Sequence, residues 1–287
     1  MHSPVMLNEA ISFLAIQPDG VYIDATAGLG GHTGAMAQKL STGLVIACDR
    51  DAESLALAKQ NTEAFASRIR YCHTEFSNLA RTLSEMGIGG ADGLLADLGV
   101  SRHQLLDDPE RGFSIMADGP LDMRMDRTKG MPAAHLVNTL DEKTLADLIF
   151  NGGERRNARR IARAIVGGRP YTTTLHLAGA VAAVVPRTSK IHPATQTFQA
   201  LRMAVNDEQG ELERFLEAAP DLVKKGGRIV VISFMSLDDK KIKESFKSLA
   251  RQGRATLLTK HVVRPAREEI VGNPASRSAK LRAIEMN

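Results

Sequence analysis

Residues Tyr22–Gly34 read YIDATAGLGGHTG, a short β-rich run followed by small residues and a cluster of glycines. Gly28, Gly30 and Gly31 would let the backbone approach a ligand closely, and the helix that follows would point its N-terminus at a negative group. The same glycines would equally serve a tight strand-to-helix turn without any ligand. The loop alone therefore leaves a nucleotide cofactor and a plain turn open.

Strands and helices alternate around this loop through the first hundred residues. Strand-like runs are predicted at 21–26, 44–49, 69–76 and 92–98, with helices between them at 31–40, 52–66 and 78–86. From about residue 105 to 193 we find no good strand, and helical patterns occupy 140–150, 155–166 and 175–185. Alternation then resumes, with helices at 194–205, 208–223 and 238–252 and strands at 228–234, 255–263 and 278–285.

This order of elements predicts an α/β fold with a doubly wound, mostly parallel sheet, interrupted by an all-helical insertion. We expect residues 1–106 and 193–287 to form the α/β domain and residues 107–192 to form the inserted helical domain. A chain of 287 residues with 43% hydrophobic and 24% charged residues is long enough and apolar enough for such a core.

The overall charge and the cysteines place weak limits on function. A net charge of +4 permits a nucleic-acid partner without requiring one. Cys48 and Cys72 form no metal-ligand pattern and read as buried, reduced thiols, so no metal is expected. The N-terminus lacks the pattern of a signal peptide and no apolar run is long enough to span a membrane, which predicts a cytoplasmic protein.

An acid after the second strand favours a nucleoside cofactor. Asp49 ends that strand nineteen residues after Gly30, about where a carboxylate accepts both hydroxyls of a ribose. The dinucleotide fingerprint G-x-G-x-x-G, counted from Gly28, would need glycine where Thr33 stands, so S-adenosylmethionine fits better than a nicotinamide cofactor. Phe76, at the end of the third strand, either lies against the adenine or packs in the core.

The fourth strand ends in LLADLGVS, and its Asp97 either faces the cofactor pocket or caps a loop. Four long motifs occur farther along the chain: RGFS (Arg111–Ser114), GPLDMRMD (Gly119–Asp126), HPATQTFQALRMAVNDE (His192–Glu208) and NPASRSAKLRA (Asn273–Ala283). Together with the glycine loop they resemble, over nearly the whole chain, the bacterial methyltransferases that modify the N4 amine of a cytidine in 16S ribosomal RNA, at the P-site decoding region.

The resemblance implies a class I methyltransferase fold, Rossmann-like, with an antiparallel last strand and an inserted helical domain. It implies S-adenosylmethionine as methyl donor and 16S ribosomal RNA, within a small ribosomal subunit particle, as partner; it leaves a homodimer open. The cofactor contacts carried over are Gly30, Gly31, His32, Asp49, Phe76, Asp97 and Gln104. His32 and Gln104 come from the resemblance alone.

Asp97 is the candidate catalytic residue, because the N4 amine of cytosine is a poor nucleophile. The N4 lone pair of cytosine is delocalised into the ring, so acceptors that hold its N–H bonds favour the positive charge developing in the transition state. A carboxylate at the end of the fourth strand suits this task. Phe113 in RGFS is a candidate to stack on the target base, with core packing as the alternative.

Several basic residues are candidates for RNA binding. Arginines recur at helical spacing and form either a solvated face or a phosphate-binding one: Arg155, Arg156, Arg159, Arg160 and Arg163. Arg111 and His192, which lie in the shared motifs, are further candidates. A second basic stretch, residues 260–282, is similar but more dispersed.

The sequence leaves two alternative functions to be considered. A nicotinamide-dependent oxidoreductase would use the same fold, but Thr33 at the third glycine position argues against it. An RNA-binding ribosome assembly factor with a vestigial pocket would need neither Asp49 nor Asp97, yet both acids are intact.

Overall fold

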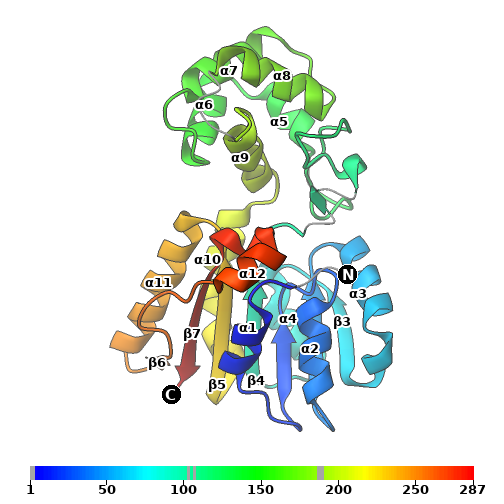
Figure 1. The fold of residues 1–287 in the computed structure, drawn as a ribbon, viewed down its shortest axis with the longest axis vertical. Helices are drawn as coiled ribbons and strands as arrows, with labels where there is room; N and C mark the ends of the chain where they lie inside the picture. Colours follow the sequence, from blue (N-terminus) through cyan, green and yellow to red (C-terminus); the bar gives the residue numbers. More distant parts are fainter. Residues whose placement is uncertain (1–3, 102–103, 106–107, 186–190) are drawn as a thin grey trace. The chain divides into compact units, whose positions relative to one another are not determined.

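The computed structural model describes residues 4–101, 104–105, 108–185 and 191–287 (Figure 1). The chain forms two compact units. One combines Met1–Gly99 with Gln209–Asn287 and is called the α/β unit below; the other, Val100–Glu208, is called the helical unit.

The α/β unit is built on a seven-stranded sheet in the order β3-β2-β1-β4-β5-β7-β6. Strands β1 to β5 pair in parallel, whereas β7 pairs antiparallel with both β5 and β6. The strands are β1 Val21–Asp24, β2 Leu44–Asp49, β3 Ile69–His73, β4 Ala91–Asp97, β5 Val223–Ser233, β6 Ala255–Leu257 and β7 Lys280–Met286. The doubly wound class I methyltransferase sheet with an antiparallel last strand is therefore confirmed.

Helices cover both faces of this sheet. They are α1 Leu7–Leu14, α2 Gly31–Lys39, α3 Ala52–Asn61, α4 Leu79–Glu85, α10 Glu208–Leu222, α11 Ser236–Arg251 and α12 Arg267–Gly272. Short 3₁₀ turns lie at η1 Glu63–Arg68, η2 Phe76–Asn78 and η5 Pro274–Ser278. One core holds Leu94 and Val231 under α10 and α11, and the other holds Leu95 and Val230 with α1 and α2. Consecutive strand residues thus enter opposite cores, which explains the continuous apolar runs of the central strands.

Three predicted strands end at least two residues early: β1 at Asp24, β3 at His73 and β6 at Leu257. β3 stops where the chain turns into η2, although the amide of Thr74 still donates to Asp49 O of β2. β6 stops at Leu257, although the amides of Leu258 and Val263 still bond to carbonyls of β7. The helices α1 and α12 were not predicted, nor was the helix at residues 133–139 of the helical unit.

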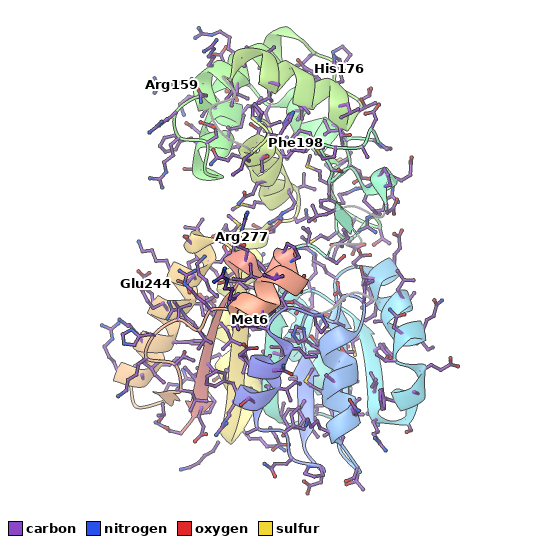
Figure 2. The ribbon with its side chains drawn as sticks, viewed as in Figure 1. Met6, Arg159, His176, Phe198, Glu244 and Arg277 are labelled. Atoms are coloured by element: carbon purple, nitrogen blue, oxygen red, sulfur yellow. The ribbon has the colours of Figure 1, made fainter. Side chains whose placement is uncertain are left out.

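The helical unit contains α5 Ala133–Thr139, α6 Glu142–Asn151, α7 Ala158–Gly167, α8 Thr174–Val184 and α9 Thr195–Val205, with the 3₁₀ turn η4 Pro109–Arg111. Its core includes Leu145, Ile161 and Leu177. Phe198 of α9, labelled in Figure 2, belongs to the same core. The unit spans Val100–Glu208, whereas the expected limits were 107–192. At the C-terminal end the difference arises because α9 buries its apolar face in this core.

Candidate active site

Three carboxyl groups end neighbouring strands of the sheet: Asp24 on β1, Asp49 on β2 and Asp97 on β4. Side chains alternate between the faces of a sheet, so each acid shares a face with the residue two positions before it. Those residues all lie in the core beneath α1 and α2: Tyr22, Ala47 and Leu95. The acids therefore face the same side at the carboxyl edge of the parallel strands, where ligands bind in such sheets.

Asp49 fastens the glycine loop to the end of β2. Its Oδ2 accepts a hydrogen bond of 2.7 Å from the amide of Gly28, and its Oδ1 accepts one of 2.8 Å from the amide of Asp51. Burial nevertheless raises the pKa of Asp49 to about 6. Each carboxylate oxygen has a second lone pair that remains suited to a hydroxyl donor such as a ribose.

The glycines of the loop are required by close packing. Gly30 has φ 87°, and a Cβ there would lie 2.9 Å from the Thr62 methyl group. A Cβ on Gly31 would lie 3.1 Å from the ring of Pro4. Gly30 directly precedes α2, whose first-turn amides have no intrahelical acceptor and carry the positive end of the helix dipole. The loop thus presents donors to an anionic group such as a carboxylate.

A buried network links the glycine loop to β4. Thr33 Oγ1 donates to Asp24 Oδ2 over 2.6 Å, and the amide of Thr26 donates to Asp24 Oδ1 over 3.2 Å. Thr26 Oγ1 in turn accepts 2.6 Å from the amide of Asp97. Burial raises the pKa of Asp24 to about 6, against the lowering effect of these bonds. The residue that breaks the dinucleotide fingerprint, Thr33, therefore holds the acid of β1.

Sequence reasoning missed Asp24 as a member of this site. Its position was nevertheless informative, because it ends β1 as Asp49 and Asp97 end their own strands. Thr33 stands out in the sequence only as a departure from a glycine pattern, and its partner is visible only in the folded chain.

Asp97 retains an unsatisfied acceptor. Its side chain is 22% exposed, yet Oδ1 is buried and has no hydrogen-bond partner among the described residues. Burial, with a smaller contribution from the negative charge of Asp24, raises the pKa of Asp97 to about 8. An orphaned carboxyl oxygen at the ligand edge of the sheet indicates a donor or a cation supplied by a ligand.

His32 lies beside Asp97 as a neutral ring. Its Nδ1 is 3.9 Å from Asp97 Oδ2, which is too long for a hydrogen bond. Burial lowers the pKa of His32 to about 4, and Nε2 lies 3.1 Å from Val5 O. A neutral imidazole that donates from Nε2 fits this geometry. His32 therefore anchors the segment before α1 and offers no positive charge to Asp97.

The residues at this edge fit S-adenosylmethionine. The orphaned Asp97 oxygen suits a positively charged ligand, Asp49 suits ribose hydroxyls, and the first turn of α2 suits a carboxylate.

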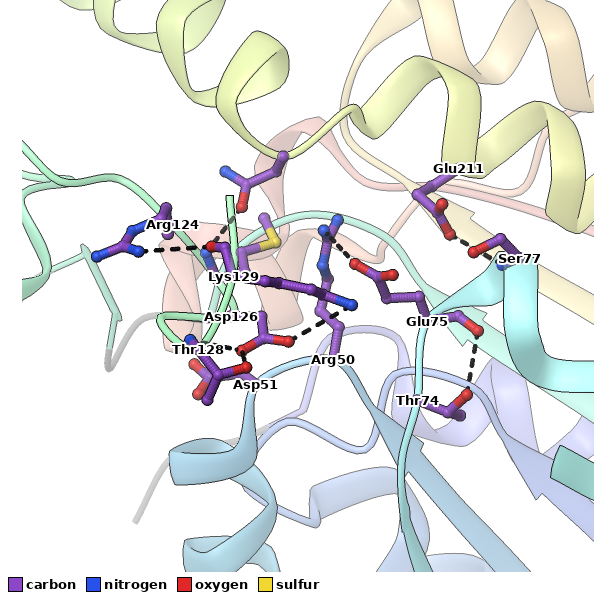
Figure 3. Close-up of polar contacts among 12 residues, drawn as sticks. Arg50, Asp51, Thr74, Glu75, Ser77, Arg124, Asp126, Thr128, Lys129 and Glu211 are labelled. Carbon is purple, nitrogen blue, oxygen red and sulfur yellow. Dashed lines mark hydrogen bonds and ion pairs between the residues drawn. The ribbon is translucent and has the colours of Figure 1, made fainter. Parts of the chain in front are cut away.

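Phe76 packs toward the other core of the sheet. Its ring centroid lies 4.7 Å from that of Phe215, and the side chain is half-buried against the cluster under α10. The turn that carries it is fixed on both sides (Figure 3), because Arg50 bonds Glu75 over 2.9 Å and the amide of Ser77 donates 2.9 Å to the Glu211 carboxylate. Core packing of Phe76 is thus observed, and its adenine contact stays a prediction.

Two RNA candidates in the helical unit are built into its interior. Arg111 is 2% exposed, and its guanidinium donates to the carbonyl oxygens of Arg124 and Met125 over 3.2 and 2.9 Å. Phe113 is 6% exposed and belongs to the helical core. Core packing is therefore observed for both side chains, and an RNA contact by Arg111 and stacking by Phe113 stay predictions.

The other two motif residues have local partners. Gln104 is buried, and its Oε1 accepts 2.9 Å from the amide of Ser101. His192 Nδ1 accepts 3.2 Å from the amide of Ala194, just before α9 begins. Both belong to the helical unit, and a cofactor contact by Gln104 and an RNA contact by His192 stay predictions.

The arginine face of α7 is solvent-exposed. Buried Ile161, Ala162 and Ile165 hold the opposite side of the helix in the core. Its exposed members are Arg159, Arg160 and Arg163 on α7 and Arg155 and Arg156 in the turn just before it, with Arg159 labelled in Figure 2. Arg163 Nε lies 3.3 Å from Glu142, and the Arg155 guanidinium lies 5.9 Å from the centre of the Phe150 ring. Within the described residues, the four arginines other than Arg163 therefore form no ion pair.

Among the described residues, no helix combines the length and apolar character that crossing a bilayer needs.

Comparisons with known proteins agree with the geometry. The model of the MraW methylase family matches residues 1–287. The ribosomal RNA small subunit methyltransferase H of Solibacter usitatus is 62% identical over 286 residues, covering 100% of both chains. The protein of the same name from Acidobacterium capsulatum is 49% identical over 294 residues, covering 99% of this chain and 98% of its own.

Solved structures resemble the fold more distantly. An rRNA methylase from Streptococcus thermophilus is 13% identical, with a TM-score of 0.46 and coverage of 100% of this chain and 99% of its own. TrmN from Thermus thermophilus is 14% identical, with a TM-score of 0.47 and coverage of 98% and 48%. The resemblance drawn from the sequence motifs is confirmed by the family match and the curated relatives.

Proposed function

The chain belongs to the MraW methylase family, and from this premise we propose that it methylates the exocyclic N4 amine of a cytidine in the P-site decoding region of 16S ribosomal RNA. S-adenosylmethionine is the methyl donor. The observation that carries the proposal is the buried Asp97 Oδ1 without a partner among the described residues, at the ligand edge of the sheet beside two further acids.

The cofactor set is proposed as follows. Asp49 accepts hydrogen bonds from the ribose hydroxyls with the lone pairs that Gly28 and Asp51 leave available. The first-turn amides at Gly31 and His32 hold the carboxylate of the methionine moiety. Asp24 does not touch the ligand in this scheme; through Thr26 it positions the backbone of Asp97.

Asp97 is the proposed catalytic residue. S-adenosylmethionine supplies an electrophilic methyl group when bound. The ionised Asp97 carboxylate accepts one N–H of the target amine, which turns its lone pair out of the ring plane and stabilises the positive charge developing on nitrogen. With a pKa raised to about 8, the same carboxylate is well matched to take the proton that the amine must lose.

The helical unit is the proposed RNA-recognition domain. Its exposed arginines Arg155, Arg159 and Arg160, on α7 and in the turn before it, would contact phosphates of the 16S RNA within a small subunit particle. The density of positive charge on these arginines supports phosphate contacts. In proteins that bind nucleic acid, phosphate contacts position the protein and do not depend on the base sequence.

The test is methylated-nucleoside analysis of 16S ribosomal RNA from cells with and without this protein. N4-methylcytidine should be present in the first and absent in the second, and purified protein with S-adenosylmethionine should restore it on isolated subunits. An Asp97→Asn protein provides the matched control. Full restoration by Asp97→Asn would leave Asp97 as a binding residue only. A modification that never depended on the chain would favour an assembly factor with a vestigial pocket.

A further inference from the structure

The positive charge of the α/β unit is concentrated in one segment. Residues 240–264 contain eight Lys and Arg against a single acid, Glu244, a net charge of +7. The whole chain carries only +4, so the remaining residues together are acidic. The segment comprises most of α11, the strand β6 and the chain just after it.

Three of the eight cations are neutralised by acids. Lys240 lies 4.0 Å from Glu244, Lys241 pairs with Glu213, and Arg254 lies 2.6 Å from Asp221. The other five form no ion pair or hydrogen bond with any described residue: Lys243, Lys247, Arg251, Lys260 and Arg264. These five leave a positive surface that the described part of the protein does not compensate.

Four of these five cations share one surface. Lys243, Lys247 and Arg251 follow each other at four-residue intervals on α11, so they project from one side of the helix over about 12 Å. Lys260, from the segment after β6, joins Lys243 and Lys247 around a small hollow that Thr259 and Phe246 also line. Figure 2 shows the side chains of α11, with Glu244 labelled. These four cations, Lys243, Lys247, Arg251 and Lys260, are called the α11 basic surface below.

Tertiary packing holds these like charges together. Ile242, Phe246 and Leu249 are buried on the opposite side of α11, which fixes the helix against the sheet. Like charges four residues apart on a helix are mutually destabilising. An anionic partner would remove this repulsion and gain several charge-assisted contacts at once.

The shape of the surface selects phosphate rather than a base. The hollow holds about 10 Å³, which is room for about one water molecule and too little for a nucleobase. Three flexible ammonium groups around such a hollow suit the oxygens of a phosphodiester backbone.

We propose that the α11 basic surface binds backbone phosphates of the ribosomal RNA at a distance from the target nucleotide. This inference rests on the proposed function, since it assigns a second contact for the same substrate. α11 packs on the core that holds Val231, whereas the three acids of the active site share a face with Leu95 in the other core. The surface therefore supplies affinity and takes no part in the chemistry.

The test compares two variants that each lose three positive charges, one from this surface and one from elsewhere on the α/β unit. The test variant is Lys243→Gln, Lys247→Gln and Lys260→Gln. The control is Lys39→Gln, Lys59→Gln and Lys225→Gln, which takes the same charge from exposed lysines on α2, α3 and β5. Binding of unmodified small subunits is measured from 50 to 200 mM salt, together with single-turnover methylation and S-adenosylmethionine affinity.

We expect the test variant to lower the slope of log K against log salt by about 2–3, at about 0.7–0.9 for each phosphate that the protein no longer binds. The methylation rate at saturating subunits and the S-adenosylmethionine affinity should equal those of the unaltered protein. The control should keep the original slope. If the triple variant does not fold, Lys247→Gln alone should lower the slope by about 0.7–0.9.

Equal salt slopes in the test and control variants would overturn the inference. It would also be overturned if the test variant lost binding to phosphatidylglycerol vesicles but not to subunits, which would assign the surface to a membrane. Absence of methylation by the unaltered protein would instead reject the proposed function, and the salt slope would still report whether this surface binds RNA.

Discussion

The carboxylate of Asp49 accepts a hydrogen bond of 2.7 Å from the backbone amide of Gly28, which lies 21 residues earlier in the chain. One side chain thus joins the end of β2 to the glycine loop after β1. The other carboxylate oxygen holds the amide of Asp51 at the start of α3. Asp49 therefore shapes the loop even before any ribose is bound. Its removal should affect both the conformation of the loop and the binding of the ribose.

Asp49→Ala should weaken S-adenosylmethionine binding by about 2–4 kcal/mol, because alanine cannot accept the two charge-assisted hydrogen bonds from the ribose. Isothermal calorimetry on the folded variant measures this. Asp51→Ala is the control: Asp51 caps α3 through the amides of Glu53 and Ser54, so its removal should lower the stability by about 1 kcal/mol and leave cofactor affinity intact. Unchanged affinity in Asp49→Ala would remove Asp49 from the cofactor site.

Asp97→Asn should reduce the single-turnover rate by at least about 10²-fold at saturating cofactor and RNA, equivalent to roughly 2.7 kcal/mol. Asparagine keeps the shape but loses the charge, and its NH₂ group can face the amine donor to donor. An interaction confined to the transition state lowers kcat, whereas a cofactor anchor alone would be rescued by saturation. A full rate at saturation would leave Asp97 as a binding residue only.

Asp97 should also make the ligand-free protein less stable as pH rises. Folding raises its pKa from 3.8 to about 8, so the folded state binds more protons than the unfolded state between these values. The free energy of unfolding therefore falls through this window. Urea unfolding at pH 5 and pH 8.5 should show Asp97→Asn gaining stability relative to the unaltered protein at the higher pH. A pH-independent difference would contradict the raised pKa.

Replacing Arg155, Arg159 and Arg160 on the α7 face by alanine should weaken RNA binding at physiological salt. The slope of log K against log salt should fall by about 0.7–0.9 for each phosphate that these arginines no longer neutralise. Cofactor affinity should not change. Lys143→Ala, which removes a cation already 3.0 Å from Asp147, is the control. A salt slope unchanged in the triple variant would identify the face as merely solvated.

Two glycines of the helical unit should respond in opposite directions to alanine. A Cβ on Gly152 would lie 2.1 Å from that of Ala200 on α9, so Gly152→Ala should destabilise the protein by about 1–3 kcal/mol. Gly179 lies within α8 with no atom near a Cβ, so Gly179→Ala should stabilise it by about 0.4–1 kcal/mol. Thermal unfolding compares them. Tolerance of Gly152→Ala would contradict the close packing of α6 and α9.

The sequence by itself determined the order of the seven strands and of most helices, although α1, α5 and α12 were not predicted. β2 has the predicted bounds, because a parallel strand buried on both faces is one continuous apolar run that stops at its acid. The glycine loop and Asp49 could also be recognised from the sequence, because the spacing within a strand–turn–helix unit is set locally. The long motifs supplied the family and with it the antiparallel last strand.

Only the tertiary structure decided which polar and aromatic side chains are accessible. Phe113 and Arg111 are buried and Phe76 packs on Phe215, because burial depends on neighbours far away in the sequence. The pairing of Asp24 with Thr33 likewise appears only when α2 folds back over β1. Finally, α11 and the segment after β6 became one basic surface because a sheet brings together residues that the chain separates, and charge complementarity is a property of that assembled surface.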